Sequence, residues 1–405
     1  MSPLASYRRL FSLAGPLYVA IAFIGRLPLA MAQMGTLLLV AGTTGSYGTG
    51  GAAGALAVTN AIGAPIAGAL ADRVGQRPVV FVQSVLGGLG LIALVVLAHA
   101  QVTPWIVILT AALAGAAMPQ IGPLARVRWR PITRNQKHHQ PRLMEAAFSY
   151  EGAADEASFV LGPALLGLVV VLASPELALL IAAAILLVFG CAFALHPTAR
   201  LTHAHRPDAA ATGRLVTGTF AILLVAQLLI GVVFGSIQTG TTVLTTDAGQ
   251  SGLAGLVHAC LGVGSVIAGL AVAALPARFG YGSRVLVAAL GLALLSLPLL
   301  VTDTVPQLFA VVLVLGFVVA PYMISVFMLG ERAAPVERVG AAMTLLAGAT
   351  GLGYALGSAT AGRLADMHGH PGAFAVTVGA ALTAAALATA SQPALRRLAS
   401  GGAHP

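Results

Sequence analysis

Long apolar runs, each long enough to cross a lipid bilayer, dominate this sequence. A bilayer with a hydrocarbon core about 30 Å thick needs about 20 consecutive apolar residues in a helix. In lipid the backbone must satisfy its own hydrogen bonds, so each run is predicted to be helical. Only 8% of the 405 residues are charged, which indicates an all-α integral membrane protein. The runs cover residues 12–41, 46–70, 79–99, 104–125, 146–172, 177–195, 215–244, 252–275, 284–302, 307–329, 341–362 and 372–391.

The basic residues predict how these spans are oriented. With a cytoplasmic N-terminus, all 21 Lys and Arg residues except Arg26 and Arg363 fall on the cytoplasmic side. The basicity therefore reflects membrane topology, and nucleic acid is not an expected partner. A composition rich in Ala, Gly and Arg, with Lys137 as the single lysine, indicates a GC-rich bacterial genome. We expect a multi-pass protein of the inner (plasma) membrane with cytoplasmic N- and C-termini.

A polar segment divides the spans into two groups of six. We expect an N-terminal six-helix bundle in residues 1–195, a cytoplasmic linker in 196–214 and a C-terminal six-helix bundle in 215–405. The halves are weakly similar, since "VLGPALLG" at 160–167 matches "ALGSATAG" at 355–362. Two repeated bundles are the architecture of many secondary transporters.

The loop after the second span carries a family motif. The segment "GALADRVGQR", residues 68–77, resembles the signature loop Gly-x-Leu-x-Asp-Arg-x-Gly-Arg-Arg of the major facilitator superfamily, with Gln76 as the main departure. A degenerate copy, "AALPARFGYGSR", follows the eighth span. The resemblance covers nearly the whole chain and implies the major facilitator fold, with 12 transmembrane helices in two pseudo-symmetric halves. It also implies that this loop latches the halves on the cytoplasmic side through Asp72, Arg73 and Arg77. Within the loop, Gly75 permits a tight turn and Gly68 allows close helix packing.

The fifth span contains a second motif. Gly162, Pro163 and Gly167 resemble the tail of a Gly-Pro motif found in proton-driven exporters of the superfamily. Pro163 predicts a bend, and the glycines predict close packing against the eighth span at Gly262, Gly264 and Gly269. A packing seam of small residues, common to many transporters, is the alternative. Such exporters often carry an arginine within the fourth span, whereas here Arg126 is expected only at its cytoplasmic end.

Four charged residues lie well inside predicted spans, away from the span ends. A charge at the bilayer centre costs roughly 2.5–3.5 kcal/mol on insertion scales, so Arg26, Glu151, Asp155 and Glu156 need a reason to be there. We expect Arg26 to pair with Asp155 or Glu156, and the other carboxylate to be a candidate proton-coupling site. A fixed structural ion pair is the alternative. His258 has no acidic residue nearby in the sequence, which disfavours a proton-relay role.

Uncharged polar residues in the spans are weaker candidates for the wall of a substrate cavity. They are Gln33, Asn60, Gln227, Gln238 and Tyr322.

The sequence narrows the class of function to a membrane transporter. Lys137 has no glycine-rich loop around it, which excludes an ATP-driven pump for this chain alone. No nucleophile with a base and no metal-ligand spacing indicates an enzyme, so no cofactor or metal is expected. The preferred function is proton-coupled efflux of small hydrophobic or amphipathic compounds by a monomer. Transport of a sugar, peptide or other polar metabolite is the alternative, and a non-transporting sensor is a third.

Overall fold

The computed structural model describes residues 2–44, 51–100, 102–202, 215–250, 253–276 and 279–400, and the regular structure in these ranges is helical. The helices of the N-terminal half are α1 (Pro3–Ala14), α2 (Pro16–Ile24), α3 (Leu27–Thr44), α4 (Gly51–Val74), α5 (Gln76–His99), α6 (Pro104–Ala117), α7 (Ile121–Thr133), α8 (Gln140–Leu172), α9 (Pro175–Ile185) and α10 (Cys191–Leu195). The helices of the C-terminal half are α11 (Gly218–Asp247), α12 (Ala254–Val272), α13 (Tyr281–Ser296), α14 (Val305–Ala333), α15 (Val339–Ala390) and α16 (Gln392–Ser400). Residues 203–214 of the predicted linker lie outside the described ranges.

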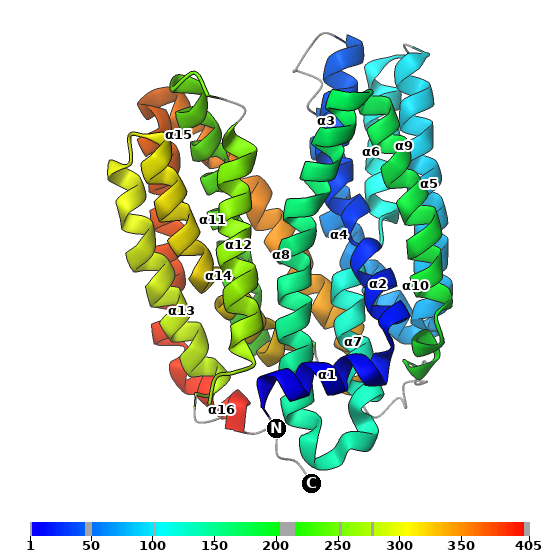
Figure 1. The fold of residues 1–405 in the computed structure, drawn as a ribbon, viewed down its shortest axis with the longest axis vertical. Coiled ribbons are helices and arrows are strands. Elements are labelled where there is room, and N and C mark those ends of the chain that lie inside the picture. The colour runs from blue at the N-terminus through cyan, green and yellow to red at the C-terminus, as the bar shows by residue number, and fades with distance from the viewer. Residues whose placement is uncertain are drawn as a thin grey trace.

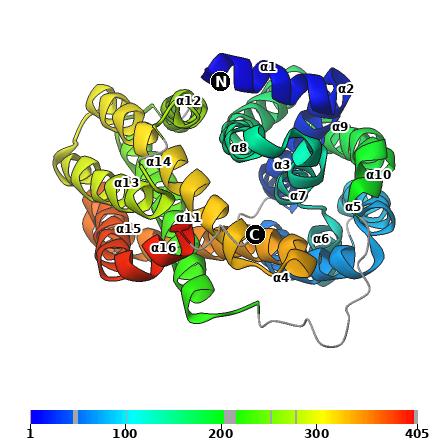
Figure 2. The same ribbon diagram turned by 90° about the horizontal axis from the view of Figure 1, so that it is seen from below.

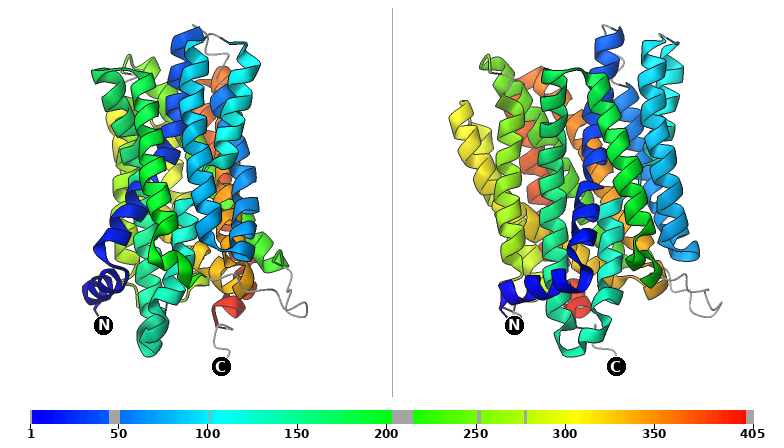
Figure 3. Two further views of the ribbon diagram at one scale, coloured as in Figure 1. Left: turned by 90° about the vertical axis from the view of Figure 1, so that its right-hand side faces the viewer. Right: turned by 45° about the vertical axis from the view of Figure 1, so that its right-hand side comes forward.

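The described helices account for twelve membrane crossings, as predicted. Nine segments are long and apolar enough to cross a bilayer, but Pro104–Leu172 and Val336–Ala390 hold 69 and 55 residues, too many for one crossing of about 20. The first turns back near Lys137, whose φ is 12°, and the second at Gly369, whose φ is 66°. The 24-residue helix α4 runs alongside these segments and completes the set (Figure 3).

The helices form two bundles that meet at one end of the molecule. Figure 1 shows α2–α10 on the right and α11–α14 on the left, and Figure 2 shows the same division from below. The first and last helices, α1 and α16, lie at the bottom of Figure 1, which we call the termini end; the opposite end is the far end. One hydrophobic core joins the C-terminal half to the part of the N-terminal half near the termini end, while a second core lies within the N-terminal half alone. The two halves are therefore packed together most firmly at the termini end.

The first predicted span begins later than expected. Residues 12–14 belong to α1, which lies across the termini end rather than along the bundle (Figure 3). Gly15, with a φ of 82°, ends α1, and Pro16 starts α2. Proline suits the first turn of a helix because it has no N–H to leave unpaired.

The fourth and fifth spans are longer than expected. α7 continues to Thr133 and α8 begins at Gln140, so the segment 126–145, which the predicted spans leave as a cytoplasmic connection, is helical. The prediction failed because it treated each arginine as solvent-exposed, whereas Arg126 and Arg128 are only 2% and 0% exposed.

Candidate functional site

A break in the first membrane-spanning helix places Arg26 inside the N-terminal half. Gly25 and Arg26 form a turn between α2 and α3. Gly25 is needed for close packing, because a Cβ at this position would meet Ile121 of α7. The Arg26 side chain is only 4% exposed, so it requires partners within the protein.

Two carboxylates of α8 supply these partners. Arg26 Nη2 donates a hydrogen bond to Glu151, and Arg26 Nε lies 3.2 Å from Asp155 Oδ1. Arg126 Nη2 lies 2.8 Å from the other oxygen of Asp155. Trp129 Nε1 donates to Glu151 Oε1 over 2.6 Å. Two cations and two anions alternate in this buried cluster, so its formal charge is zero and each ion has an opposite charge beside it.

Two further contacts fix this charge cluster in place. The guanidinium of Arg126 lies 4.3 Å from the ring centre of Phe327 on α14, a cation–π contact that reaches the C-terminal half. Gly122 of α7 lies directly against Asp155, since a Cβ at this position would collide with the carboxylate. The position of Asp155 therefore depends on the absence of a side chain at residue 122.

Glu156 lies outside the charge cluster. It forms no ion pair with any residue of the described ranges and is only 9% exposed. It lies beside Ser265 of α12, and its carbonyl oxygen is near Gly262 of the same helix. Glu156 is thus a buried acid at the interface between the two halves.

The structure changes the pairing expected from the sequence. Arg26 was expected to pair with Asp155 or Glu156. It pairs with Asp155 and also with Glu151, whereas Glu156 lies outside the charge cluster. Glu151 is deeper than expected because α8 begins at residue 140 instead of near 146.

The fourth span does contain a buried arginine, contrary to expectation. Arg126 lies six residues into α7 and is bound to Asp155. The sequence signal was the segment "ARVRWR", in which Arg126 and Arg130 are four residues apart and therefore share a helix face with neighbouring Trp129.

Gln76, the departure from the superfamily loop, has a specific partner. Its side-chain oxygen accepts a hydrogen bond from Arg128 Nε over 2.8 Å, and its amide donates to the carbonyl of Leu124 over 3.2 Å. Arg128 is fully buried and stacks on Phe193 with 3.6 Å between the guanidinium carbon and the ring centre. An arginine at position 76 would place a second cation against Arg128, so glutamine fits this chain.

Asp72 joins the two halves at the termini end. Its two oxygens accept hydrogen bonds from the backbone N–H groups of Gly340 and Ala341, over 2.9 and 2.7 Å, at the start of α15. A carboxylate is favourable there because the first N–H groups of a helix have no partner within the helix. Gly68, one turn earlier, lets α4 approach Thr344.

The other residues of the loop motif lie elsewhere. Gly75 has a φ of 92° and allows the turn into α5. Arg73 and Arg77 are exposed, and neither has an ion-pair partner among the residues that the structure describes.

Two ion pairs cross the same interface. Arg284 of α13 pairs with Glu145 of α8, and Arg130 of α7 pairs with Glu331 of α14. The first pair is mostly buried, whereas the Arg130 side chain is 53% exposed. Together with Asp72, these pairs form what we call the termini-end gate.

The glycines of the α8 motif pack differently from the expectation. Gly162 faces Ala30 and the carbonyl of Leu27 on α3, within its own half, and Gly167 has no neighbour within 4 Å of a Cβ position. Pro163 lies inside the continuous helix α8. The contact with α12 instead uses Val160, which fills the space beside Gly262.

The predicted cavity residues do not form one site. Asn60 donates to the carbonyls of Gly115 and Met118, both over 3.0 Å, and so supports the break between α6 and α7. Gln238 accepts a hydrogen bond from Tyr354 of α15. The remaining candidates are Gln33, which is partly exposed on α3, Gln227, which is fully buried, and Tyr322, which donates to the carbonyl of Ala226.

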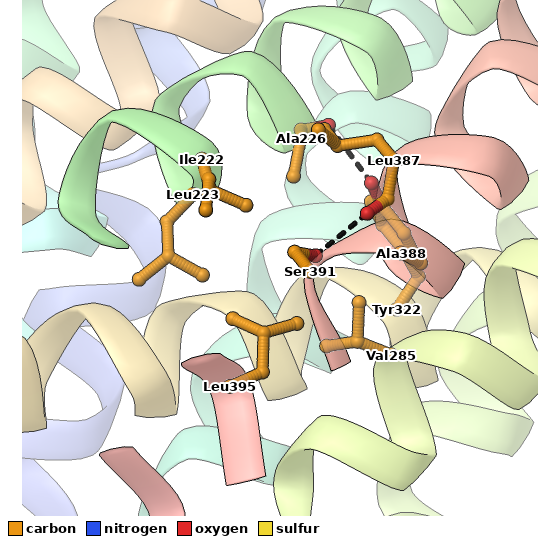
Figure 4. Close-up of a pocket in the computed structure, with 9 residues that line it drawn as sticks. All are labelled: Ile222, Leu223, Ala226, Val285, Tyr322, Leu387, Ala388, Ser391 and Leu395. Atoms are coloured by element: carbon orange, nitrogen blue, oxygen red, sulfur yellow. Dashed lines mark hydrogen bonds between the residues drawn. The ribbon is translucent and has the colours of Figure 1, made fainter. Parts of the chain in front are cut away.

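A small pocket in the C-terminal half is not a convincing substrate site (Figure 4). Its lining is mostly apolar and includes Leu223, Val285 and Leu395. Its hydroxyl groups already donate to backbone carbonyls, Tyr322 to Ala226 over 3.1 Å and Ser391 to Leu387 over 2.6 Å. Nothing there presents a free donor to a ligand.

Solved transporters share this fold. The human organic anion transporter MFSD10 (TETRAN) has a TM-score of 0.71 at 20% identity, covering 91% of this chain and 98% of that chain. A bacterial homologue of the iron transporter ferroportin, in an outward-facing state, has a TM-score of 0.69 at 14% identity, covering 92% and 98%. The transporter FucP, in the outward conformation, has a TM-score of 0.67 at 15% identity, covering 93% and 99%.

Sequence comparison assigns the family. No curated protein is significantly similar to the chain. The sequence profile of the Major Facilitator Superfamily, a family of transporters, matches residues 19–330 and 223–401, which together span most of the chain. The protein therefore belongs to the Major Facilitator Superfamily.

Proposed function

We propose that the protein is a secondary active transporter that exports small hydrophobic or amphipathic compounds in exchange for protons. The observation that carries the proposal is Glu156, a buried acid at the interface between the halves that has no ion-pair partner among the described residues. In alternating access the two halves rock against each other. A titratable group on their interface is therefore in a position to link proton binding to that motion.

The surroundings of Glu156 give this link a physical basis. Burying a carboxylate without a cation is costly, so a proton on Glu156 and the packing of α8 against α12 favour each other. Glu151 and Asp155 differ, because Arg26 and Arg126 neutralise them within the charge cluster. We assign coupling to Glu156 and a structural role to the charge cluster.

We further propose that the termini end is cytoplasmic and that the protein is a monomer of the inner membrane. The basic residues concentrate at that end, as the positive-inside rule requires. With the termini-end gate closed, the conformation would face outward, in keeping with the two outward-facing relatives. Labelling with a membrane-impermeant thiol reagent in intact cells tests this: Asp303→Cys at the far end should react and Arg134→Cys should not.

A polar metabolite is the alternative substrate. Gln238 and Thr242 are exposed on one face of α11, and Tyr354 bonds to Gln238. Export of apolar compounds is preferred because the α8 motif resembles that of exporters and because α7 carries the buried Arg126.

Proteoliposomes with an imposed pH gradient test the proposed coupling. A compound panel is screened for uptake or release that depends on the gradient, with a trapped pH dye recording proton flux. Glu156→Gln should abolish gradient-driven flux and leave exchange of substrate for substrate. The matched control is Asp247→Asn, at an exposed acid of α11 without an ion-pair partner in the described ranges.

Three outcomes separate the functions considered. Gradient-driven transport of drug-like compounds supports export, whereas transport of sugars, peptides or nucleosides supports the alternative. Full proton-driven flux in Glu156→Gln would overturn the coupling role. If compounds of both classes bind but none is transported, a sensor would be favoured.

A further inference from the structure

The seam between α8 and α12 carries polar groups that the charge cluster does not use. This seam is a close contact between the halves: Val160 lies against Gly262, and Gly269 lies against the backbone of Ala153 and the side chain of Ala320. Glu156 lies between these two contact points, beside Ser265.

Helical spacing adds His258 to the same face of α12. Residues 258, 262, 265 and 269 are separated by four, three and four positions, so they fall within a narrow stripe of the helix. Gly262 and Gly269 lie against α8 and Ser265 lies beside Glu156, so this stripe is the one that meets α8. His258 is seven residues from Ser265, which is about 10 Å along the helix axis toward the far end.

This stripe carries buried polar side-chain atoms. Ser265 is fully buried, and neither its Oγ nor the buried Nδ1 of His258 has a hydrogen-bond partner within the described part of the chain. A buried polar atom left unpaired costs about 1–3 kcal/mol, so such atoms call for an explanation. Here they occur at successive depths on one seam that leads to Glu156.

We propose that His258 and Ser265 form a proton path along the α8–α12 seam, connecting Glu156 with the far end. Water at the far end gives a proton to the imidazole of His258, which releases one to a water molecule that enters between α8 and α12 when Val160 and Gly262 move apart. Ser265 Oγ takes a proton from this water and passes its own to a Glu156 oxygen. Each transfer breaks one O–H or N–H bond and forms another, so no other reactant is needed.

The groups around Glu156 agree with this direction of entry. Asp155, on its own helix, is held by Arg26 and Arg126 and is not free to act as a relay. α12 contributes Ser265 and His258. α14 contributes the apolar side chains of Ala320 and Ile324 on this part of the seam, and Phe327 toward Arg126.

Time-resolved infrared spectroscopy of the full-length protein in lipid nanodiscs tests the path. This proposal rests on the proposed function, in which Glu156 binds the proton. A light-sensitive compound in the solution releases protons when it is illuminated. Protonation of Glu156 is then followed through the C=O stretch of its carboxyl group, and this band is assigned by its absence in Glu156→Gln. His258→Gln and Ser265→Ala should slow its appearance about a hundredfold, as expected when a positioned proton-transfer group is removed. The equilibrium size of the band should stay the same, because Glu156 itself is unchanged.

Matched variants separate a path from a packing effect. Ser84→Ala removes a buried hydroxyl without a described partner on α5, and His99→Gln replaces a histidine near the far end of the same helix; both should keep the wild-type rate. Wild-type rates in His258→Gln and Ser265→Ala, with a normal Glu156 band, would overturn the path and leave the proposed function intact. A wild-type protein whose Glu156 band does not respond to pH would overturn both.

Discussion

The two halves share one fold but use buried charge in opposite ways. In the N-terminal half, Arg26, Arg126, Glu151 and Asp155 bind one another inside their own bundle. In the described part of the C-terminal half, the buried charged residues are Arg284 and Glu331, and both pair with the other half. The N-terminal half is held by internal ion pairs, whereas the C-terminal half uses its buried charges at the termini-end gate.

This difference separates ion pairs that stabilise one bundle from ion pairs that break when the bundles move. A buried ion pair is strongly destabilised when one partner is removed, so pairs within one bundle keep that bundle rigid. Pairs between bundles must break whenever the halves separate. Inside the C-terminal half, neutral polar groups bind one another. For example, the hydroxyl groups of Ser236 and Thr377 form a hydrogen bond over 2.7 Å. Disrupting internal pairs should therefore reduce stability, while disrupting interface pairs should shift conformation.

Arg26→Ala is expected to have the largest effect. It leaves Glu151 without a cation, and removing one partner of a buried pair costs about 3–5 kcal/mol. Thermal unfolding in detergent measures the loss, and adding Glu151→Gln should recover part of it. The control in the other half is Gln227→Leu, which replaces a buried amide without a described partner by an apolar side chain of similar size and should change little. Equal destabilisation by both variants would contradict the contrast between the halves.

Gly122→Ala should be the next most damaging change. The new methyl group would collide with Asp155 and displace it from Arg126, and overpacking of this kind costs about 1–3 kcal/mol. Gly167→Ala is the matched control, because a Cβ there meets nothing within 4 Å. The same unfolding assay should find Gly167→Ala neutral or slightly stabilising, and a neutral Gly122→Ala would show that Asp155 is not confined.

Asp72→Ala tests the gate instead of the bundle interior. It removes two hydrogen bonds that backbone N–H groups of α15 donate to the Asp72 carboxylate, each worth about 1.5–3 kcal/mol. We expect normal thermal unfolding but a larger population opened at the termini end. Pulsed EPR distances between spin labels at the ends of α7 and α16, with Cys191 and Cys260 replaced, measure this population. Arg73→Gln, at an exposed position, should leave the distances unchanged, and an Asp72→Ala protein that stays fully closed would contradict the latch.

The sequence was sufficient to predict the fold but not the pairing of the charges. Apolar runs predict the membrane spans directly, because every crossing must be long and apolar. The loop motif at 68–77 predicts the family. The partners of Arg26 depend on the helix break at Gly25 and on the first residue of α8. Neither is encoded by hydropathy, which averages over many residues.

Arg126 illustrates the same limit. Hydropathy ends its span at the first arginine, yet Asp155 on the neighbouring helix lets the arginine enter the protein interior. The partner is 29 positions away in the sequence, and only the tertiary structure brings the two together. The separation of Glu156 from the charge cluster likewise follows from which face of α8 meets α12.

Arg130→Ala should have the smallest effect. Its partner Glu331 is buried, but the Arg130 side chain is 53% exposed, so water and salt screen the pair and its contribution is about 0–1 kcal/mol. The EPR distances at the termini end should shift only slightly, and less at high salt, because screening already weakens the wild-type pair there. Arg284→Ala provides the comparison, since Arg284 is largely buried and its loss should open the gate further. If Arg130→Ala opened the gate as much as Asp72→Ala, the exposed pair rather than the helix cap would be the main contact that holds the halves together.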